Sequence, residues 1–293
     1  MTGPDSRNAP AVVVLGRVGY DLFAEERDTP LKSVRTFSRY LGGSSANMAV
    51  GMARLGIRVE MISCLGDDAL SRFLIEYLEG EGVSTRAIQI REGALPSLCL
   101  TEVSPPDRFP QVFYRENAAD TMVSFGEKEK ELISGASMLV TNGTSLCASP
   151  SRESTLAALE HARRSGAVVA FDVDYRAMSW RSPQEAGLYA RIAAGLCDLF
   201  IANPTEIALT AEVEEPEAAM SRLREMGVPI VVAKLGSAGT QVTTAEETLF
   251  LPPYPVDVTS TIGAGDGFAS GFLAARLLGK SLAESLQFGN AAA

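Results

Sequence analysis

Over most of the chain, short strand-like apolar runs alternate with longer segments whose apolar residues recur at helical spacing. Residues 11–15 are a continuous apolar run that ends at Gly16, which is typical of a buried strand. Further strands are expected at 58–65, 138–141, 167–172, 198–202 and 229–233, and helices at 42–55, 71–81, 151–165, 184–196 and 217–226. This alternation predicts an α/β fold, a doubly wound and mostly parallel sheet flanked by helices.

Two stretches in the first half, about 17–40 and 88–118, interrupt the alternation. Both have strand-like patterns, and the second contains two such runs on either side of Pro105-Pro-Asp107, which is a hairpin signal. We expect them to form a small β-sheet lid at one edge of a single domain spanning 11–293. Open strand edges on such a lid could pair with a second copy, so a homodimer through the lid is a further expectation.

Composition narrows the class of protein. The chain has 293 residues and a formal net charge of −10, which argues against a nucleic-acid-binding surface. No apolar run approaches the roughly 20 residues that cross a bilayer, and the polar residues 1–10, expected to be a disordered tail, lack a signal-peptide core. Four widely spaced cysteines favour buried thiols over metal ligands. Together these features predict a cytoplasmic enzyme without a membrane or nucleic-acid partner.

The stretch Ser260-Thr-Ile-Gly-Ala-Gly-Asp-Gly267 leads into an apolar helical segment that starts at Phe268. Backbone N–H groups at a helix start lack intrahelical partners, and the helix dipole there favours anions. Glycines let such a backbone approach a phosphate closely, and Asp266 could then act as a base. The same residues also suit an ordinary loop in which Asp266 caps the helix, so this stretch alone leaves both interpretations open.

Polar residues and glycines follow one expected strand after another. They include Gly16, Asp21, Asn142, Gly143, Asp172, Asp174, Arg176, Asn203, Glu206, Gly236, Ser237 and Gly239, and the stretch 263–266. Ligands of open α/β sheets bind outside the carboxyl ends of the strands. The pattern therefore predicts one binding site along this edge of the sheet.

Three blocks of the sequence resemble the signatures of the ribokinase-like (PfkB-type) sugar kinase family. Residues 42–56 resemble its amino-terminal signature, and 263–266 its carboxy-terminal one. Residues 203–206 (Asn-Pro-Thr-Glu) and 234–239 (Lys-Leu-Gly-Ser-Ala-Gly) resemble its magnesium and nucleotide motifs. The resemblance runs from about residue 11 to the end, and it implies ATP-dependent phosphorylation of a sugar hydroxyl.

The resemblance also implies roles for individual residues. Asp266 would be the general base, and the backbone of Gly263, Ala264 and Gly265 would bind the transferring phosphate. Glu206, with Asn203, would organise Mg²⁺ through water. The implied nucleotide-site residues are Asn203, Glu206, Lys234, Gly236, Ser237, Gly239 and Asn290. The implied sugar-site residues are Asp21, Gly42, Gly43 and Asn47, because carboxylate and amide groups suit vicinal hydroxyls.

One position departs from the family pattern. Members of the family often have Asp-Thr-Thr before Gly-Ala-Gly-Asp, whereas this chain has Ser260-Thr261-Ile262. The nearest upstream carboxylate is Asp257, three residues earlier. The monovalent cation that the family can bind near this aspartate is therefore an open expectation.

The substrate class is suggested by Tyr114, Arg115 and Arg176. Two arginines near a sugar pocket indicate a carboxylate-bearing substrate, because a guanidinium pairs with a carboxylate in a fork. Alternatively, the arginines could form structural ion pairs with Glu116 and Asp172. These features resemble the family members that act on keto-deoxy sugar acids, of which more than one fits, rather than those that act on ribose or fructose. A non-catalytic sugar sensor on the same fold is the alternative from another class.

Overall fold

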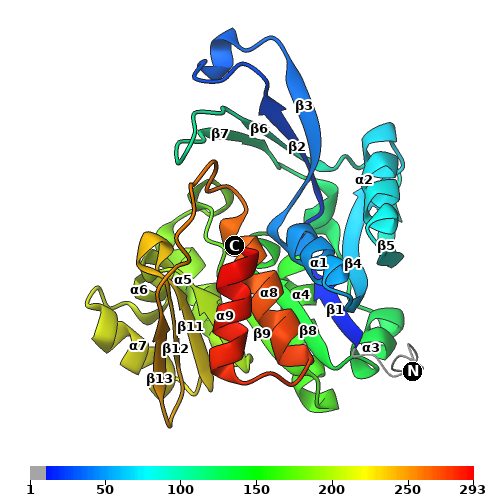
Figure 1. Cartoon of the computed structure of the whole chain (residues 1–293). Coiled ribbons are helices and arrows are strands. Elements are labelled where there is room, and N and C mark those ends of the chain that lie inside the picture. The colour runs from blue at the N-terminus through cyan, green and yellow to red at the C-terminus, as the bar shows by residue number, and fades with distance from the viewer. Residues whose placement is uncertain (1–10) are drawn as a thin grey trace, which may run out of the picture.

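A computed structural model describes residues 11–293, and the expected tail at 1–10 lies outside the described residues. Most of the described chain forms one α/β body with a large central sheet (Figure 1). Its strands are β1 (Ala11–Leu15), β4 (Arg58–Gly66), β5 (Val83–Arg91), β8 (Met138–Asn142), β9 (Val168–Asp172), β10 (Leu199–Ala202), β11 (Ile230–Lys234), β12 (Thr240–Thr243) and β13 (Thr248–Leu251). The helices are α1 (Ser44–Arg54), α2 (Ala69–Gly80), α3 (Glu127–Ser134), α4 (Ser151–Ser165), α5 (Pro183–Ala194), α6 (Pro204–Ala211), α7 (Pro216–Glu225), α8 (Ala264–Leu277) and α9 (Leu282–Ala292).

The large sheet has the order β13-β12-β11-β10-β9-β8-β1-β4-β5. Strands from β5 to β11 pair in parallel, and β12 and β13 add an antiparallel hairpin at one edge. The mostly parallel sheet predicted from the alternation is therefore confirmed. Because parallel strands share one direction, β1, β8, β9, β10 and β11 all end at the same edge, as Asn142 beside Asp172 illustrates.

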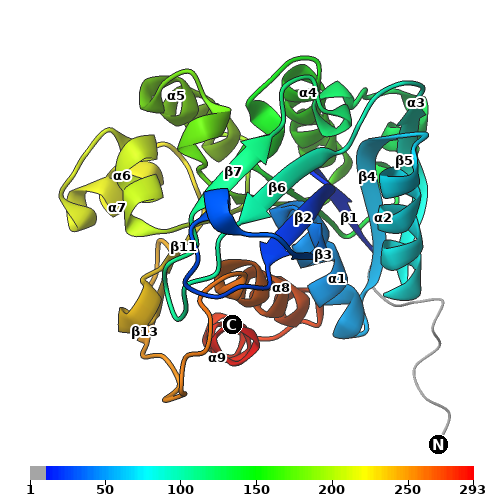
Figure 2. The same cartoon turned by 90° about the horizontal axis from the view of Figure 1, so that it is seen from above.

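Helices cover both faces of the sheet, which gives the molecule two hydrophobic layers (Figures 1 and 2). Along β1, Val13 and Leu15 face one layer, and Val12 and Val14 face the other. The first layer includes residues of α3, α4, α5, α6 and α7, and the second includes residues of α1, α2, α8 and α9. Burial of β1 on both sides explains why its sequence is continuously apolar rather than alternating.

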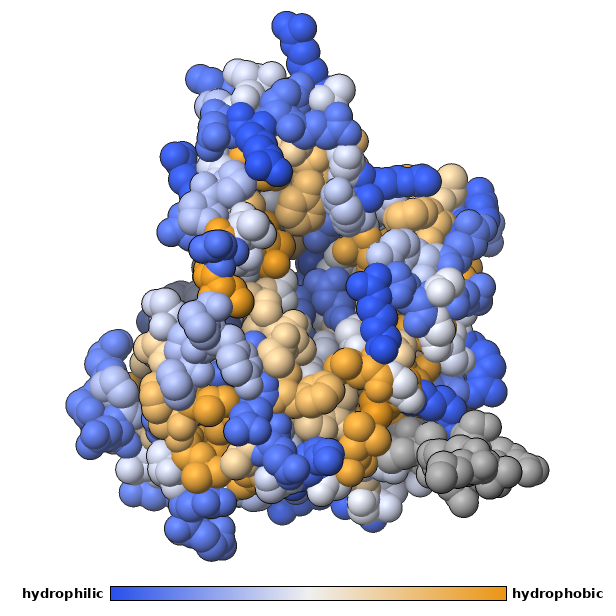
Figure 3. Space-filling view, viewed as in Figure 1, coloured by the Kyte–Doolittle hydropathy of each residue, from blue (hydrophilic) through white to orange (hydrophobic). Residues whose placement is uncertain are grey.

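A second, four-stranded sheet stands apart from the body as a lid (Figure 1). It consists of β2 (Gly19–Ala24), β3 (Phe37–Gly42), β6 (Ser97–Thr101) and β7 (Gln111–Tyr114) in the order β3-β2-β6-β7. Figure 3 shows this lobe rising above the body with a mainly hydrophilic outer end. The lid thus lies over the sheet edge at which the carboxyl ends of the parallel strands meet.

Some element boundaries differ from the expectations. The second lid stretch begins at Ser97 rather than at residue 88, because 83–91 form β5 and pair with β4 in the large sheet. Helix α3 has no counterpart among the expected elements. Helix α6 also begins where only an Asn-Pro turn was expected, because Asn203 and Glu206 cap it reciprocally. Among the helices that the structure describes, none is long and apolar enough to cross a membrane.

Candidate active site

Helix α8 begins at the carboxyl edge of the sheet with backbone N–H groups available for an anion. Gly263 is its N-cap, with φ of 82°, and the first i→i−4 bond runs from the N–H of Gly267 to the carbonyl of Gly263 (2.8 Å). The N–H groups of Gly265 and Asp266 precede that bond and lie in the first turn. Asp266 is thus inside the helix and is not its cap, so the helix-cap interpretation of this aspartate is wrong.

Asp266 is held by two side chains from α1. Ser44 Oγ donates to Asp266 Oδ1 at 2.7 Å, and Asn47 Nδ2 donates to Oδ2 at 2.8 Å. The partners lie in the amino-terminal signature and Asp266 in the carboxy-terminal one, so the packing of α1 against α8 assembles the two motifs into one site. Each carboxylate oxygen can still accept a further hydrogen bond, which a substrate hydroxyl could provide.

A buried ion pair lies beside the start of α8. Lys234, at the end of β11, contacts both carboxylate oxygens of Asp172, at the end of β9, at 2.6 and 2.9 Å. A methyl group added at Gly265 would lie 3.7 Å from Lys234 Nζ, so the ammonium is close to the helix start. Burial raises the pKa of Asp172 against the pull of Lys234, and the carboxylates of Asp172 and Glu206 raise the pKa of Lys234 although burial lowers it. The raised pKa of Lys234 keeps a positive charge at this place.

Glu206 joins two loops at the same edge. Its Oε2 accepts from the N–H of Asn203 and its Oε1 from the N–H of Tyr175, both at 2.8 Å. In return, Asn203 Oδ1 accepts from the N–H of Glu206 at 2.9 Å. The Glu206 side chain is buried, but each of its oxygens still has a free lone pair. It can therefore accept a hydrogen bond from a water molecule of a hydrated cation.

A small cavity of about 70 Å³ lies between the lid and the start of α8. It is lined by Arg17, Asp21, Phe23, Gly43, Ser44, Asn47, Gln111, Phe113, Arg115, Thr144, Asp174, Arg176, Ser179, Ile262, Gly263 and Asp266. The structure thus brings together seven of the site residues expected from the sequence, namely Asp21, Gly43, Asn47, Arg115, Arg176, Gly263 and Asp266. This lining combines carboxylates, arginines and amides in the way a polar sugar acid requires.

Asp21 has a buried oxygen available for a ligand. Its Oδ1 is buried and has no hydrogen-bond partner among the described residues. Burial raises the pKa of Asp21, and the guanidinium groups of Arg17 and Arg176 oppose this rise. Gly42 makes room for the carboxylate, because a Cβ there would lie 2.0 Å from Asp21 Oδ1. An acceptor of this kind suits a sugar hydroxyl.

Arg115 and Arg176 both line the cavity, but their carboxylate partners differ from those considered in the sequence. Arg115 donates through Nε and Nη2 to Asp120 Oδ2 at 2.9 and 2.6 Å, rather than to Glu116. Arg176 Nε donates to Asp174 Oδ1 at 3.0 Å, because Asp172 is bound to Lys234 instead. The side chain of Arg176 is 48% exposed and that of Arg115 is 9% exposed.

Tyr114 does not line the cavity, contrary to expectation. Side chains alternate between the two faces of a strand, so Phe113 faces the cavity and Tyr114 points to the opposite face of β7. Tyr114 is 63% exposed there. Phe113, rather than Tyr114, therefore faces this cavity.

The expected nucleotide residues lie around the hairpin that joins β11 to β12. Gly236 and Ser237 are exposed in the turn between the strands, whereas Gly239 is buried. Asn290, in α9, accepts a hydrogen bond from Thr240 Oγ1 at 2.9 Å and donates to the carbonyl of Pro252 at 3.1 Å. These bonds tie α9 to the hairpin and place Asn290 near the exposed turn.

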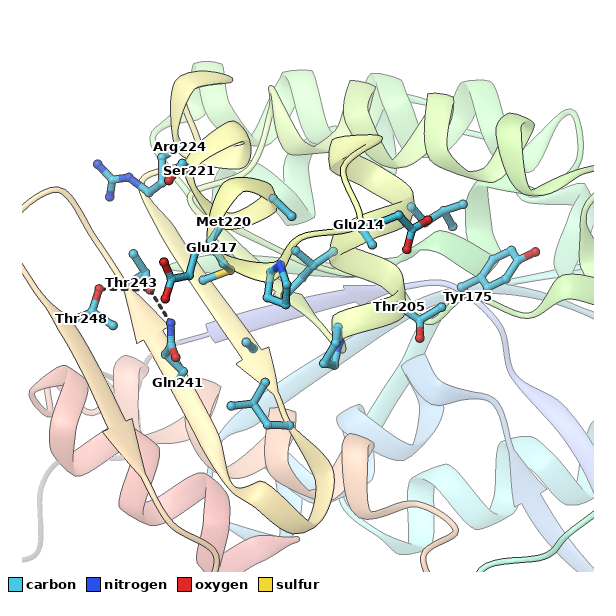
Figure 4. A pocket seen from close by; sticks show the side chains of 18 of the residues that line it. Tyr175, Thr205, Glu214, Glu217, Met220, Ser221, Arg224, Gln241, Thr243 and Thr248 are labelled. Atoms are coloured by element: carbon cyan, nitrogen blue, oxygen red, sulfur yellow. Dashed lines mark hydrogen bonds between the residues drawn. The ribbon is translucent and has the colours of Figure 1, made fainter.

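A larger groove of about 850 Å³ lies on the other face of β12, between α6, α7 and strands β11 to β13 (Figure 4). Gln241 and Thr243 of β12 point into it, facing Glu217 and Arg224 of α7. Thr240, which alternates with Gln241, points to Asn290 instead. The groove and Asn290 are therefore on opposite sides of the sheet, and none of Gly236, Ser237, Gly239 or Asn290 lines the groove.

Several residues that line the cavity were not predicted from the sequence, among them Ser44 and Arg17. Ser44 directly follows Gly43 in the amino-terminal signature and contacts Asp266. Arg17 directly follows Gly16 at the end of β1 and lines the cavity. The rule that selected polar residues after each strand could have found Arg17, since it stands in that position.

Residues 9–293 match the model of the pfkB family of carbohydrate kinases. A curated 5-dehydro-2-deoxygluconokinase of Geobacillus thermodenitrificans is 35% identical over 287 residues, covering 96% of this chain and 85% of the relative. The corresponding enzyme of Clostridium beijerinckii is 37% identical over 289 residues, with coverage of 96% and 85%.

A solved structure agrees with the fold. The crystal structure of aminoimidazole riboside kinase from Salmonella enterica, in complex with aminoimidazole riboside and an ATP analogue, superposes with a TM-score of 0.82 at 26% identity. The match covers 96% of this chain and 91% of that chain. The ribokinase-like arrangement of sheet and lid is therefore shared over nearly the full length of both proteins.

Proposed function

This chain belongs to the pfkB family of carbohydrate kinases, and we propose that its substrate is 5-dehydro-2-deoxy-D-gluconate. The proposed reaction transfers the terminal phosphate of ATP to the 6-hydroxyl and belongs to myo-inositol catabolism. Curated relatives of 34–37% identity carry the name of this kinase. Because the reaction consumes ATP, we propose that it takes place in the cytoplasm.

The observation that carries this proposal is Asp266, fixed by Ser44 and Asn47 at the start of α8 and facing a cavity that contains arginines. In the proposed mechanism, Asp266 accepts a hydrogen bond from the substrate hydroxyl and takes its proton as the new bond to phosphorus forms. Phosphoryl transfer depends mainly on positioning and on charge stabilisation. The N–H groups of Gly263, Ala264 and Gly265 are proposed to supply that stabilisation.

The residues present fit a nucleoside triphosphate with Mg²⁺. Lys234 places a positive charge next to the start of α8. The carboxylate oxygens of Glu206 accept hydrogen bonds from the backbone N–H groups of Asn203 and Tyr175 and still have free lone pairs. When bound, Mg²⁺ supplies charge neutralisation at the phosphates. Mg²⁺ retains much of its water shell, so Glu206 is proposed to hold it through water, with Asn203 fixing the loop.

The nucleotide itself is proposed to lie along the β11–β12 turn. Gly236 and Ser237 are exposed there, and Gly239 lets the backbone turn with φ of 111°. Asn290 is proposed to border the base, since it is anchored beside this turn by Thr240 and Pro252. A monovalent cation near 257–262 remains part of the proposal.

The lid is proposed to join two copies of the chain. Strands β3 and β7 are the edges of the lid sheet, and Tyr40 and Tyr114 on them are 51% and 63% exposed. Exposed aromatic residues beside an open strand edge favour edge pairing. A dimer in sedimentation or light scattering that becomes monomeric in Tyr114→Lys would support this arrangement, and a monomeric wild type would contradict it.

A coupled assay of ADP release tests the substrate. We expect the highest kcat/KM with 5-dehydro-2-deoxygluconate among a panel that includes 2-dehydro-3-deoxygluconate, ribose and fructose, and a phosphate on the 6-hydroxyl by ³¹P NMR. A preference for 2-dehydro-3-deoxygluconate would replace the proposed substrate by that acid. No ADP release with any sugar would instead indicate the non-catalytic sensor.

A further inference from the structure

Three arginines line the substrate cavity, and two of them already have carboxylate partners. Arg115 pairs with Asp120 and also donates to the carbonyl of Thr144 at 2.8 Å, so its guanidinium is engaged on several sides. Arg176 pairs with Asp174 and is half-exposed to solvent. Neither group depends on a ligand to balance its charge.

Arg17 differs from both. It is only 8% exposed, and within residues 12–293 no carboxylate forms an ion pair with it. Its one recorded side-chain hydrogen bond runs from Nη1 to Ser97 Oγ at 3.2 Å. A guanidinium has five N–H donors, so most of the donors of Arg17 are available to a ligand. The carboxylate of Asp21 is close enough for the Arg17 guanidinium to oppose the rise of its pKa, but the two side chains form no ion pair.

The surroundings of Arg17 hold its guanidinium in one orientation. Arg17 lies between β1 and β2 in the chain and contacts Ser97 of β6 and Phe113 of β7, with its Cζ 5.4 Å from the centre of the Phe113 ring. Gly19 leaves the necessary space, because a Cβ there would be 2.4 Å from Nη1. An arginine stacked on an aromatic ring is pre-organised to bind a planar anion in a fork.

Asp21 and Arg17 lie in the same cavity, and each has polar atoms available to a ligand. The buried Oδ1 of Asp21 has no donor among the described residues, and the guanidinium of Arg17 lines the cavity with N–H groups available to a ligand. A hydroxy acid supplies a donor for the former and an acceptor for the latter in one molecule. Asp266 lines the same cavity, so an acid bound here presents a hydroxyl to that carboxylate.

We propose that Arg17 binds the carboxylate of the sugar acid and is the residue that selects acids over neutral sugars. This inference rests on the proposed function, since it assumes a keto-deoxy acid as the substrate. It assigns the carboxylate to Arg17 rather than to Arg115 or Arg176.

The test compares Arg17→Gln with wild type on 5-dehydro-2-deoxygluconate and on the matching neutral keto-deoxyhexose, which carries a CH₂OH group in place of the carboxylate. We expect KM for the acid to rise about 10- to 100-fold, the loss of one charged hydrogen-bonded pair, with a much smaller change in kcat. The preference for acid over neutral sugar should fall by a similar factor. Arg17→Lys, which keeps the charge but loses the fork, should lie between the two.

Thermal stability provides a readout that separates a binding role from a structural one. Arg17→Gln should melt close to the wild-type temperature, because the substitution removes one hydrogen bond, to Ser97, and breaks no ion pair. The matched control Arg115→Gln should melt lower, because Asp120 then loses its partner. If Arg17→Gln melts much lower than wild type and Arg17→Lys retains full preference for the acid, the inference is wrong.

The outcomes also separate this inference from the proposed function. If wild type phosphorylates the acid and Arg17→Gln keeps the same preference for acid over neutral sugar, only the role of Arg17 is overturned. If wild type phosphorylates neutral sugars but no acid of the panel, the proposed substrate class and the role of Arg17 both fall.

Discussion

Asn47 and Asp266 are 219 residues apart in the sequence, and their side chains meet at 2.8 Å. Asn47 belongs to the first turn of α1, and Asp266 to the first turn of α8. The contact, together with that of Ser44, fixes the orientation of the carboxylate before any substrate is present. A pre-oriented base is what an in-line transfer requires, because little reorganisation then remains for the reaction itself.

Asp266→Asn should lower kcat by about two to four orders of magnitude, since an amide cannot take the proton of the substrate hydroxyl. Nucleotide affinity, measured by calorimetry, should change little. Glu92→Gln, in the exposed turn after β5, is the matched control and should keep most of the activity. A near-normal kcat in Asp266→Asn would contradict the assignment of Asp266 as the general base.

Ser44→Ala and Asn47→Ala should each lower kcat about 10- to 100-fold, because each removes one hydrogen bond to a charged group. If both residues act through Asp266, the same substitutions should have almost no further effect in the Asp266→Asn background. A double-mutant cycle on kcat measures this coupling. Full additivity would show that Ser44 and Asn47 act elsewhere, for example on the sugar.

Lys234→Met should destabilise the protein by about 3–5 kcal/mol, because Asp172 is left as a buried charge without a partner. The loss should be larger at pH 8 than at pH 5, since Asp172 can escape the cost by binding a proton only at lower pH. Urea unfolding at both pH values measures the difference. Lys280→Met, which removes an exposed pair with Glu284, should change stability by less than about 1 kcal/mol and serves as the control.

Asp174 should make stability depend on pH in the acid range. Burial raises the pKa of Asp174 to about 6, against the pull of Arg176, and Asp266 adds to the rise. The folded state holds the proton of Asp174 more tightly than the unfolded chain does. The resulting contribution to the free energy of unfolding is therefore present in full below about pH 4 and is lost as the pH rises through 6. Asp174→Asn should therefore remove up to about 3 kcal/mol of that pH dependence in unfolding experiments between pH 4 and 7. An unchanged profile would contradict the shifted pKa.

Arg115→Met should destabilise the protein by about 3–5 kcal/mol, because Asp120 is fully buried and loses two hydrogen bonds. Arg176→Met should have a much smaller effect on the free energy of unfolding, since Arg176 is half-exposed and its pair is screened by water. If the two variants lost the same free energy of unfolding, the pair of Arg115 with Asp120 would not stabilise the fold more than the pair of Arg176 with Asp174 does.

The sequence by itself determined the α/β class, the parallel sheet and the edge at which the site lies. Apolar runs such as 11–15 report burial on both faces, and the residues that follow each strand must gather at one edge because the strands are parallel. Local signals also placed the start of α8 at residues 263–266. These features depend on short-range periodicity, which a single sequence contains.

The tertiary structure decided which charged groups pair with one another. Arg115 pairs with Asp120 and Asp172 pairs with Lys234, whereas Arg17 forms no ion pair within the described part of the chain. Pairing depends on side-chain direction and on long-range packing, such as the strand alternation that turns Phe113 inward and Tyr114 outward. For the same reason Asp266 could be recognised as a candidate base from its motif, whereas its fixation by Ser44 and Asn47 required the packing of α1 against α8.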